Sequence, residues 1–260
     1  MKKLFLTCFL FAFLSSCRSK DGDFNVFSID EDIRLGKQFS EQFEQLSSSP
    51  LLVEDQYPEA YKHLRKITHE IISSKEILHR DEFAWEVRII EDDSVLNAFC
   101  TPGGYIYVYT GLIKFLDSED ELAGVLGHEI AHADLRHSTE QLTKNYGLHL
   151  IIKLFTGDAA FLGSIAGNLI SLNFSRSDES EADRQSVIYL SDTKYDARGV
   201  ARFFQKMKVD GNSSSILQFL NTHPNPENRI ENIYQEWKLL GSKSGLECKQ
   251  DYKEFKALLP

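Results

Sequence analysis

His128-Glu129-Ile130-Ala131-His132 has the form HExxH, with two histidines four residues apart and a glutamate after the first. On an α-helix, residues i and i+4 lie on one face, so the two imidazoles can bind the same tetrahedral Zn²⁺. Glu129 points to a neighbouring position, where it can take a proton from a metal-bound water. The alternative is a helix whose two histidines are satisfied by ordinary hydrogen bonds.

The residues before the motif favour a helix. Ser118 and Glu121 have the Ser-x-x-Glu spacing of a capping box, which predicts a helix start at this point. Apolar residues then recur at helical spacing, namely Leu122, Val125, Leu126 and Ile130. The HExxH motif therefore sits within a predicted amphipathic helix.

A second pair of acidic residues has the same i, i+4 spacing. Glu179 and Asp183 follow a predicted helix start near Ser177 or Asp178. Glu179 could present a carboxylate as the third zinc ligand, and Asp183 could accept a hydrogen bond from a ligand imidazole. The alternative is a solvated helix start, because carboxylates favour helix N-termini. The need for a third ligand favours the metal-site interpretation.

A loop with two prolines carries two further candidates. Pro224 and Pro226 predict a rigid loop, with a helix starting near Pro226. His223 on this loop is a candidate for a role in the cleft, and Arg229 could anchor the loop or stabilise developing charge. In isolation, each of these two residues is also explained as a structural residue.

The remaining pattern predicts an α+β domain that is mostly helical. Residues 31–46 and 57–74 have helical apolar spacing, and residues 85–90 alternate like a strand. Residues 97–112 combine a glycine turn with a strongly β-prone run, which predicts a hairpin directly before the HExxH helix. A strand beside the metal could bind a substrate backbone by strand addition, or it could be a core strand without that role.

Composition sets broad limits on function. The chain has 260 residues, 42% of them hydrophobic and 26% charged, which is ordinary for a globular protein with one sizeable core. Its formal net charge is −10. A chain this acidic is a poor general binder of nucleic acid, because phosphate contacts need a basic face.

The N-terminus has the pattern of a targeting segment. Lys2 and Lys3 precede a short apolar run over residues 4–14. The sequence Leu14-Ser15-Ser16-Cys17 resembles the bacterial lipobox, in which the cysteine becomes the lipid-modified mature N-terminus. Such acyl chains attach a protein to a membrane without a spanning helix. Ordinary secretion, with cleavage near the same place, is the alternative.

These features define the expected organisation. Residues 1–16 are the predicted signal peptide, 17–30 a tether, 31–240 the folded domain and 241–260 a C-terminal tail. The apolar residues 148–172 predict a helical hairpin that covers the core, with a membrane-touching surface as the alternative. Cys100 and Cys248 could pair in an oxidising compartment, but the sequence leaves their proximity open.

Together, the motifs resemble the HtpX-like and CAAX-prenyl-protease-like zinc metallopeptidases, peptidase family M48. The pieces that carry this resemblance occur in the family's order: Asn97-Ala98-Phe99, Pro102-Gly103-Gly104, Glu121-Leu122-Ala123 with HExxH, Ser175-Arg176 with Glu179-x-x-x-Asp183, and His223-Pro224 with Arg229. The resemblance covers roughly residues 30–237. It implies a zincin-like (gluzincin) domain with a small β-sheet beside the HExxH helix.

The resemblance also implies roles for single residues. One Zn²⁺ per chain is expected on His128, His132 and Glu179, with Glu129 as general base and Asp183 supporting a ligand. Two further residues, Glu181 and His137, are expected away from the metal, since Glu181 lies two residues from Glu179 and His137 five from His132. In related periplasmic members, the histidine that matches His223 can approach the zinc.

The function implied is a zinc-dependent endopeptidase, lipid-anchored through Cys17 in the cell envelope. Its expected substrates are unfolded or misassembled envelope polypeptides, lying extended near Asn97 and Ala98. Arg18 after the lipidated cysteine favours the periplasmic face of the outer membrane in a bacterium with two membranes. The alternative is an envelope assembly factor or holdase with an auto-inhibited or structural zinc site. In contrast to some family members, the chain has neither predicted spanning helices nor a C-terminal helical-repeat domain.

Overall fold

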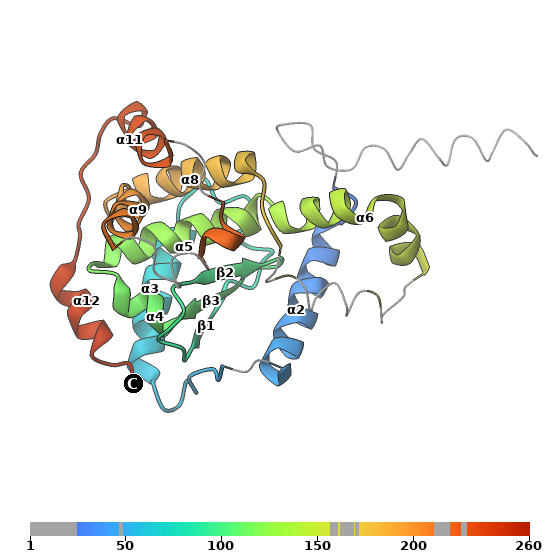
Figure 1. Cartoon of the computed structure of the whole chain (residues 1–260), viewed down its shortest axis with the longest axis horizontal. Helices are drawn as coiled ribbons and strands as arrows, with labels where there is room; N and C mark the ends of the chain where they lie inside the picture. Colours follow the sequence, from blue (N-terminus) through green and yellow to red (C-terminus); the bar gives the residue numbers. More distant parts are fainter. Residues whose placement is uncertain are drawn as a thin grey trace, which may run out of the picture.

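The computed structural model describes residues 25–46, 49–156, 161, 169, 172–210, 219–224 and 228–260. Three strands and a set of helices make up the described part (Figure 1). The elements are α2 (Ile29–Leu46), α3 (Pro58–Ile72), β1 (Glu86–Ile90), β2 (Ala98–Thr101), β3 (Tyr105–Tyr109), α4 (Thr110–Phe115), α5 (Glu119–Asp134), α6 (His137–Thr156), α8 (Arg176–Ser191), α9 (Gly199–Asp210), α11 (Arg229–Leu239) and α12 (Lys249–Lys256). The prediction of a mostly helical α+β domain with a small sheet is confirmed.

The sheet has the order β1-β3-β2, which leaves β2 at an edge. Strand β3 pairs in parallel with β1 and antiparallel with β2. The turn of the predicted β2–β3 hairpin contains Gly103 and Gly104, whose φ values of 74° and 83° lie in the left-handed region that glycine adopts without strain. The hairpin therefore forms where the sequence predicts it, directly before α4 and α5.

Helices bury both faces of the sheet. Phe99 and Tyr107 face α2, where their rings lie 6.1 and 5.9 Å from that of Phe39. Cys100, one residue after Phe99, and Ile106, one residue before Tyr107, belong to the core shared with α3 and α5. This alternation follows from the pleat, which points successive side chains to opposite faces.

Helix α5 lies at the centre, and every one of its residues is buried. Close packing requires two of its glycines. A Cβ on Gly124 would lie 2.2 Å from the backbone nitrogen of Val200 at α9, and one on Gly127 would lie 2.8 Å from Ser186 Oγ on α8. Ser186 Oγ also donates a hydrogen bond to Gly124 O at 2.9 Å. These contacts fix α8 and α9 against α5, as the parallel course of α5 and α8 in Figure 1 illustrates.

The start of α5 differs in detail from the prediction. Ser118 is the N-cap residue, as predicted, but its side chain makes no capping hydrogen bond. Glu121 accepts a hydrogen bond from the backbone nitrogen of Asp117 at 2.8 Å instead of that of Ser118. The capping box is therefore wrong, because the carboxylate of Glu121 reaches one residue further back.

The C-terminal end of α5 is held by Asp134, which is fully buried. Its carboxylate accepts hydrogen bonds from the backbone nitrogens of Leu78 and His79 and from Tyr189 Oη. The imidazole of His79 also lies 3.2 Å from this carboxylate. Asp134 thus joins the loop after α3 and helix α8 to the end of the motif helix.

The folded part begins earlier than the tether prediction of residues 17–30. Asn25 Nδ2 donates to Thr139 Oγ1 on α6 at 2.9 Å, and the side chain of Phe27 is buried. Helix α2 then starts at Ile29. Asn25 and Phe27 are therefore packed against the domain rather than part of an extended linker.

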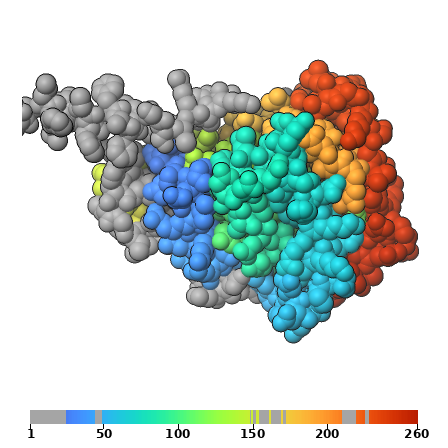
Figure 2. Space-filling view, turned by 180° about the vertical axis from the view of Figure 1, so that it is seen from behind, coloured from blue at the N-terminus to red at the C-terminus, as the bar shows by residue number. Residues whose placement is uncertain are grey.

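The C-terminal residues also pack, contrary to the expected tail over 241–260. On α12, Tyr252 and Phe255 are fully buried, and Tyr252 Oη donates to Ile113 O at 2.8 Å. Figure 2 shows the C-terminal segment and α2 at opposite sides of one face of the molecule. The amphipathic spacing of these two aromatic residues, three apart, accounts for the docking of α12.

Several predictions concern residues that are incompletely described. The signal peptide and Cys17 lie outside the described residues, as does most of the expected hairpin over 148–172. Among the residues that the structure describes, none of the helices combines the length and apolar character that crossing a bilayer requires. Cys100 and Cys248 are both free, so they do not pair with each other.

Candidate metal centre

The two motif histidines meet on one face of α5. His128 Nε2 and His132 Nε2 are 3.1 Å apart, and both rings are buried. This arrangement follows from the i, i+4 spacing, which stacks the two side chains one helical turn apart. The predicted pair is therefore present in the geometry that a single metal ion needs.

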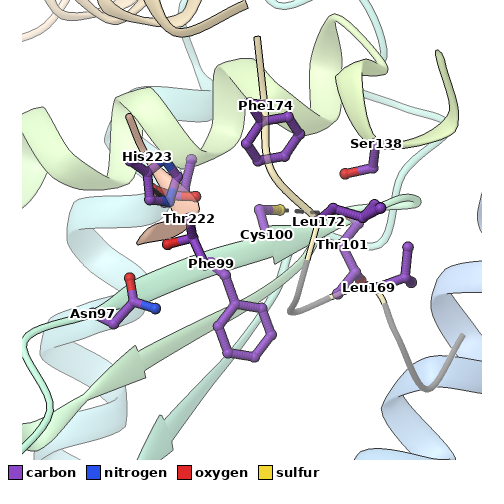
Figure 3. Close-up of a pocket in the computed structure, with 11 residues that line it drawn as sticks. Asn97, Phe99, Cys100, Thr101, Ser138, Leu169, Leu172, Phe174, Thr222 and His223 are labelled. Atoms are coloured by element: carbon purple, nitrogen blue, oxygen red, sulfur yellow. Dashed lines mark hydrogen bonds and ion pairs between the residues drawn. The ribbon is translucent and has the colours of Figure 1, made fainter. Parts of the chain in front are cut away.

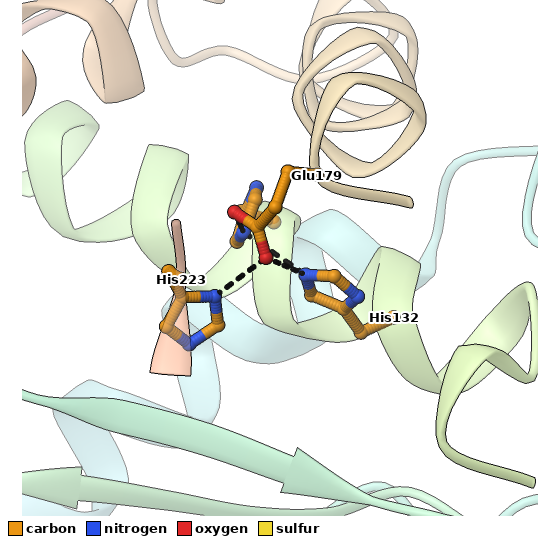
Figure 4. A group of neighbouring side chains, drawn as sticks. His132, Glu179 and His223 are labelled. Atoms are coloured by element: carbon orange, nitrogen blue, oxygen red, sulfur yellow. Dashed lines mark hydrogen bonds and ion pairs between the residues drawn. The ribbon is translucent and has the colours of Figure 1, made fainter. Parts of the chain in front are cut away.

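Helix α8 supplies a carboxylate to the same point (Figure 4). Glu179 Oε1 lies 3.3 Å from His132 Nε2, and Oε2 lies 3.5 Å from His128 Nε2. The helix begins at Arg176, one or two residues before the predicted start, because Ser175 and Asp178 form a reciprocal capping box. This cap places Glu179 in the first turns of α8, opposite α5.

Asp183 and Arg229 contact the side chains of His128 and Glu179. His128 Nδ1 lies 2.9 Å from Asp183 Oδ1, as expected for a carboxylate that supports a ligand imidazole. Arg229 donates two hydrogen bonds to Asp183, both 2.6 Å long, and its Nη1 lies 3.1 Å from Glu179 Oε2. Arg229 is itself buried. These contacts favour a role in positioning the two carboxylates.

His223 enters the site from the opposite side to α8, as Figure 4 shows. Its Nδ1 lies 3.0 Å from Glu179 Oε1, and its Nε2 lies 3.6 Å from Glu129 Oε1. The ring stacks on Phe219 with centroids 4.8 Å apart. Four residues thus offer one donor atom each within 4.8 Å of one another and could hold a metal ion: His128, His132, Glu179 and His223.

Two neighbours of His132 escape sequence reasoning. His137 is not among the clustered donors, as predicted, but its Nδ1 lies 2.9 Å from His132 Nδ1. Phe174 stacks on the ring of His132 with centroids 3.9 Å apart. Neither contact follows from helical periodicity, because α5 ends at Asp134 and the chain turns before His137. Glu181 is not among the clustered donors, as predicted, but it lies 3.3 Å from His137 Nε2.

Buried charges shift the proton affinities of the site. Burial alone would lower the pKa of His128, but hydrogen bonds to Asp183 and Glu179 raise it to about 9. Burial would raise the pKa of Glu179, yet its interactions with His223 and the motif histidines hold that pKa well below the usual range. Burial raises the pKa of Glu129 despite the opposing effect of His223. The cluster therefore favours positive charge beside an ionised Glu179.

The donor set fits a zinc ion. Two imidazole nitrogens and one carboxylate are the ligands of many catalytic zinc sites, which leave a fourth position for water. The acid Glu129 lies beside them, and no group in the described part of the chain hydrogen-bonds its buried Oε1 atom. Asp183 and Glu179 raise the pKa of His128, so the site favours a positive charge. A divalent cation would supply such a charge.

A small cavity lies between the cluster and the edge strand β2 (Figure 3). Its volume of about 20 Å³ is close to the space for one water molecule. The lining combines apolar side chains with the polar side chains of Asn97 and Glu129. Ala98 is fully buried at the start of β2. The lining residues are Asn97, Phe99, Cys100, Thr101, Glu129, Ser138, Leu169, Leu172, Phe174, Thr222 and His223.

Comparison with known proteins agrees with this geometry. The model of peptidase family M48 matches residues 58–237, well over half of the chain. The chain belongs to peptidase family M48. This match supports a metalloprotease domain over residues 58–237. The resemblance inferred from the motifs and the zincin-like fold are thereby confirmed.

The M48 chain is similar to several curated proteases. It is 34% identical over 161 residues to mitochondrial metalloendopeptidase OMA1 of Arabidopsis thaliana, a match that covers 60% of this chain and 32% of that protein. It is 27% identical over 221 residues to the putative beta-barrel assembly-enhancing protease of Vibrio cholerae, covering 79% of this chain and 44% of that protein. This chain therefore spans about a third to a half of the length of these relatives.

Proposed function

We propose that this protein is a zinc-dependent endopeptidase, attached by lipid to the bacterial cell envelope, which hydrolyses unfolded or misassembled envelope polypeptides. The observation that carries this proposal is the buried cluster of His128, His132 and Glu179 with Glu129 beside it, next to an edge strand. A purely structural metal site has no need of a neighbouring base.

His128, His132 and Glu179 would hold one zinc ion. When bound, zinc polarises the scissile carbonyl and lowers the pKa of a water molecule towards neutrality. Asp183 orients the ring of His128 through its Nδ1 atom, and Arg229 keeps Asp183 and Glu179 in place. These contacts support a site whose three ligand atoms already lie close together.

Glu129 would act as general base. Its carboxylate takes a proton from the attacking water and delivers it to the nitrogen of the leaving amine. Burial raises the pKa of this carboxyl, which suits a group that must both accept and release a proton near neutral pH. The substrate chain would lie extended along β2 near Asn97 and Ala98, where an edge strand has unpaired backbone groups.

The cellular setting rests on the N-terminal sequence and on relatives. The lipobox-like sequence that ends at Cys17 supports a lipid anchor outside the cytoplasm. Relatives from Vibrio cholerae and Yersinia pestis are named beta-barrel assembly-enhancing proteases. This similarity supports a bacterial envelope role and polypeptide substrates.

A casein-cleavage assay tests the enzymatic part of the proposal. The full chain should cleave fluorescent casein, lose activity when a chelator removes zinc, and regain it when zinc is restored. Glu129→Gln should keep zinc but lose cleavage, whereas Glu59→Gln, at an exposed site on α3, should leave both unchanged. Full activity of Glu129→Gln would refute the role of the base, and chelator-resistant cleavage would refute the zinc mechanism.

His223 favours a second candidate, an assembly factor or holdase with an auto-inhibited site. Its Nδ1 lies 3.0 Å from Glu179 Oε1, and a fourth protein ligand would close the position that a catalytic water needs. His223→Ala separates the two functions. Increased casein cleavage would support a protease restrained by His223, whereas zinc-bound but inactive wild type and variant would support the assembly factor.

A further inference from the structure

His132 contacts a second histidine through the nitrogen that faces away from the cluster. Its Nδ1 lies 2.9 Å from His137 Nδ1, and His137 Nε2 lies 3.3 Å from Glu181 Oε2. His132 is fully buried, His137 is 2% exposed, and the side chain of Glu181 is 32% exposed. A chain of polar groups therefore leads from the cluster to solvent.

Only one placement of hydrogens lets His132 bind a metal and satisfies this chain. A lone pair on His132 Nε2 requires the hydrogen on Nδ1, which then donates to His137 Nδ1. His137 Nδ1 must be the acceptor, so the neutral ring of His137 carries its hydrogen on Nε2. That hydrogen points to Glu181, which accepts it as a carboxylate.

We propose that His137 and Glu181 are positioning residues that fix the tautomer and ring orientation of His132 and thereby strengthen metal binding. This inference rests on the proposed function only in taking His132 as a ligand. A ligand histidine is generally oriented by a hydrogen bond from its other ring nitrogen, and loss of that partner weakens metal binding about 10- to 100-fold.

The two motif histidines therefore have different supports. His128 Nδ1 lies 2.9 Å from Asp183, whose carboxylate is bound by Arg229. His132 donates to a neutral imidazole, and the carboxylate is one residue further away. Because Glu181 is partly exposed, its contribution to the electron density of His132 is weaker than that of Asp183 to His128.

The turn between α5 and α6 brings His137 back over His132. Arg136 has φ of 65°, a left-handed conformation that is uncommon for a residue other than glycine. Its side chain donates to Asp32 Oδ2 at 2.6 Å and to Phe27 O at 2.5 Å. The N-terminal segment thus stabilises the conformation that places His137.

Zinc affinity tests the inference without any measurement of catalysis. The metal-free full chain, in wild-type and variant forms, is titrated with zinc against a chromophoric chelator. His137→Ala should weaken zinc binding about 10- to 100-fold. His137→Asn should restore most of the affinity, because its amide oxygen can occupy the place of Nδ1 and accept from His132. His69→Ala, at an exposed site on α3, is the matched control and should bind as wild type does.

Glu181→Gln tests the same inference if His137→Ala folds poorly. It should weaken zinc binding less than His137→Ala, and the double variant should be no worse than His137→Ala, because both changes break one chain. Unchanged affinity of His137→Ala, or additive losses in the double variant, would overturn the inference. Failure of wild type itself to bind zinc would instead overturn the proposed function.

Discussion

Replacing Arg229 by methionine tests how far the candidate metal centre depends on one buried guanidinium. Arg229 makes two hydrogen bonds of 2.6 Å to Asp183, and Nη1 lies 3.1 Å from Glu179 Oε2. All three side chains are at most 4% exposed. Methionine fills a similar volume but leaves two carboxylates in the interior without their cation.

Removing one partner of a buried ion pair costs about 3–5 kcal/mol, because the remaining charge is uncompensated. For a chain of this size, that loss corresponds to a fall in melting temperature of roughly 6–20 °C. We expect this loss in the free energy of unfolding of Arg229→Met, measured by urea denaturation in the presence of a chelator. With zinc present the deficit should shrink, since the divalent cation compensates Glu179.

Two further variants make this experiment decisive. Arg34→Met, at an arginine on α2 with 55% side-chain exposure, should change the free energy of unfolding by less than about 0.5 kcal/mol. Combining Arg229→Met with Asp183→Asn removes both charges of the closest pair, so the double variant should be more stable than additivity predicts. The reasoning is refuted if metal-free Arg229→Met unfolds within about 1 kcal/mol of wild type.

The remaining predictions concern pH, helix packing and the C-terminus. Burial would lower the pKa of His79, but hydrogen bonds to Asp134 raise it above the usual 6.5. The protonated ring therefore stabilises the fold fully below pH 6.5, and this stabilisation is lost as the pH rises through the raised pKa. The urea midpoint should fall over this pH range in wild type and fall less in His79→Gln. Gly124→Ala should destabilise the protein by about 1–3 kcal/mol or more in thermal unfolding, because its Cβ would lie 2.2 Å from the α9 backbone. Gly127→Ala should destabilise it less, because its Cβ would meet a side chain that can rotate. Equal losses of stability in the two variants would contradict this explanation. Tyr252→Ala should cost about 3–5 kcal/mol by urea denaturation, and a change below about 1 kcal/mol would mean that α12 is not part of the stable core.

Helical spacing accounts for what sequence predicted of the site. His128 and His132 share a face because both lie on one uninterrupted helix, and the same argument applies to Glu179 and Asp183 on α8. Resemblance to a family added that His223 belongs beside these residues, since no local pattern joins it to α5. Sequence could therefore identify the groups that the structure brings together, although not their distances.

Helical spacing could not predict contacts between residues on different secondary-structure elements. His137 reaches His132 only because Arg136 turns the chain with a positive φ, and Arg136 is no glycine that would signal such a turn. The docking of Tyr252 depends on the surface that α4 and α5 present, which a pattern within residues 241–260 does not contain. Ser118 was correctly placed as N-cap, but side-chain geometry decided that Glu121 binds Asp117.

If the proposed lipid anchor at Cys17 is correct, the packing of Asn25 against α6 limits the distance between the folded domain and the membrane. Eight peptide steps separate Cys17 from Asn25, and an extended chain spans at most about 3.5 Å per residue, so the reach is roughly 28 Å. If Cys17 carries the lipid, the segment between Cys17 and Asn25 can extend no further than the thickness of the hydrocarbon core of a bilayer, about 30 Å. The folded domain would then stay close to the membrane surface. Polypeptides that emerge from the bilayer or stall at it would be more accessible to the site than polypeptides that diffuse freely.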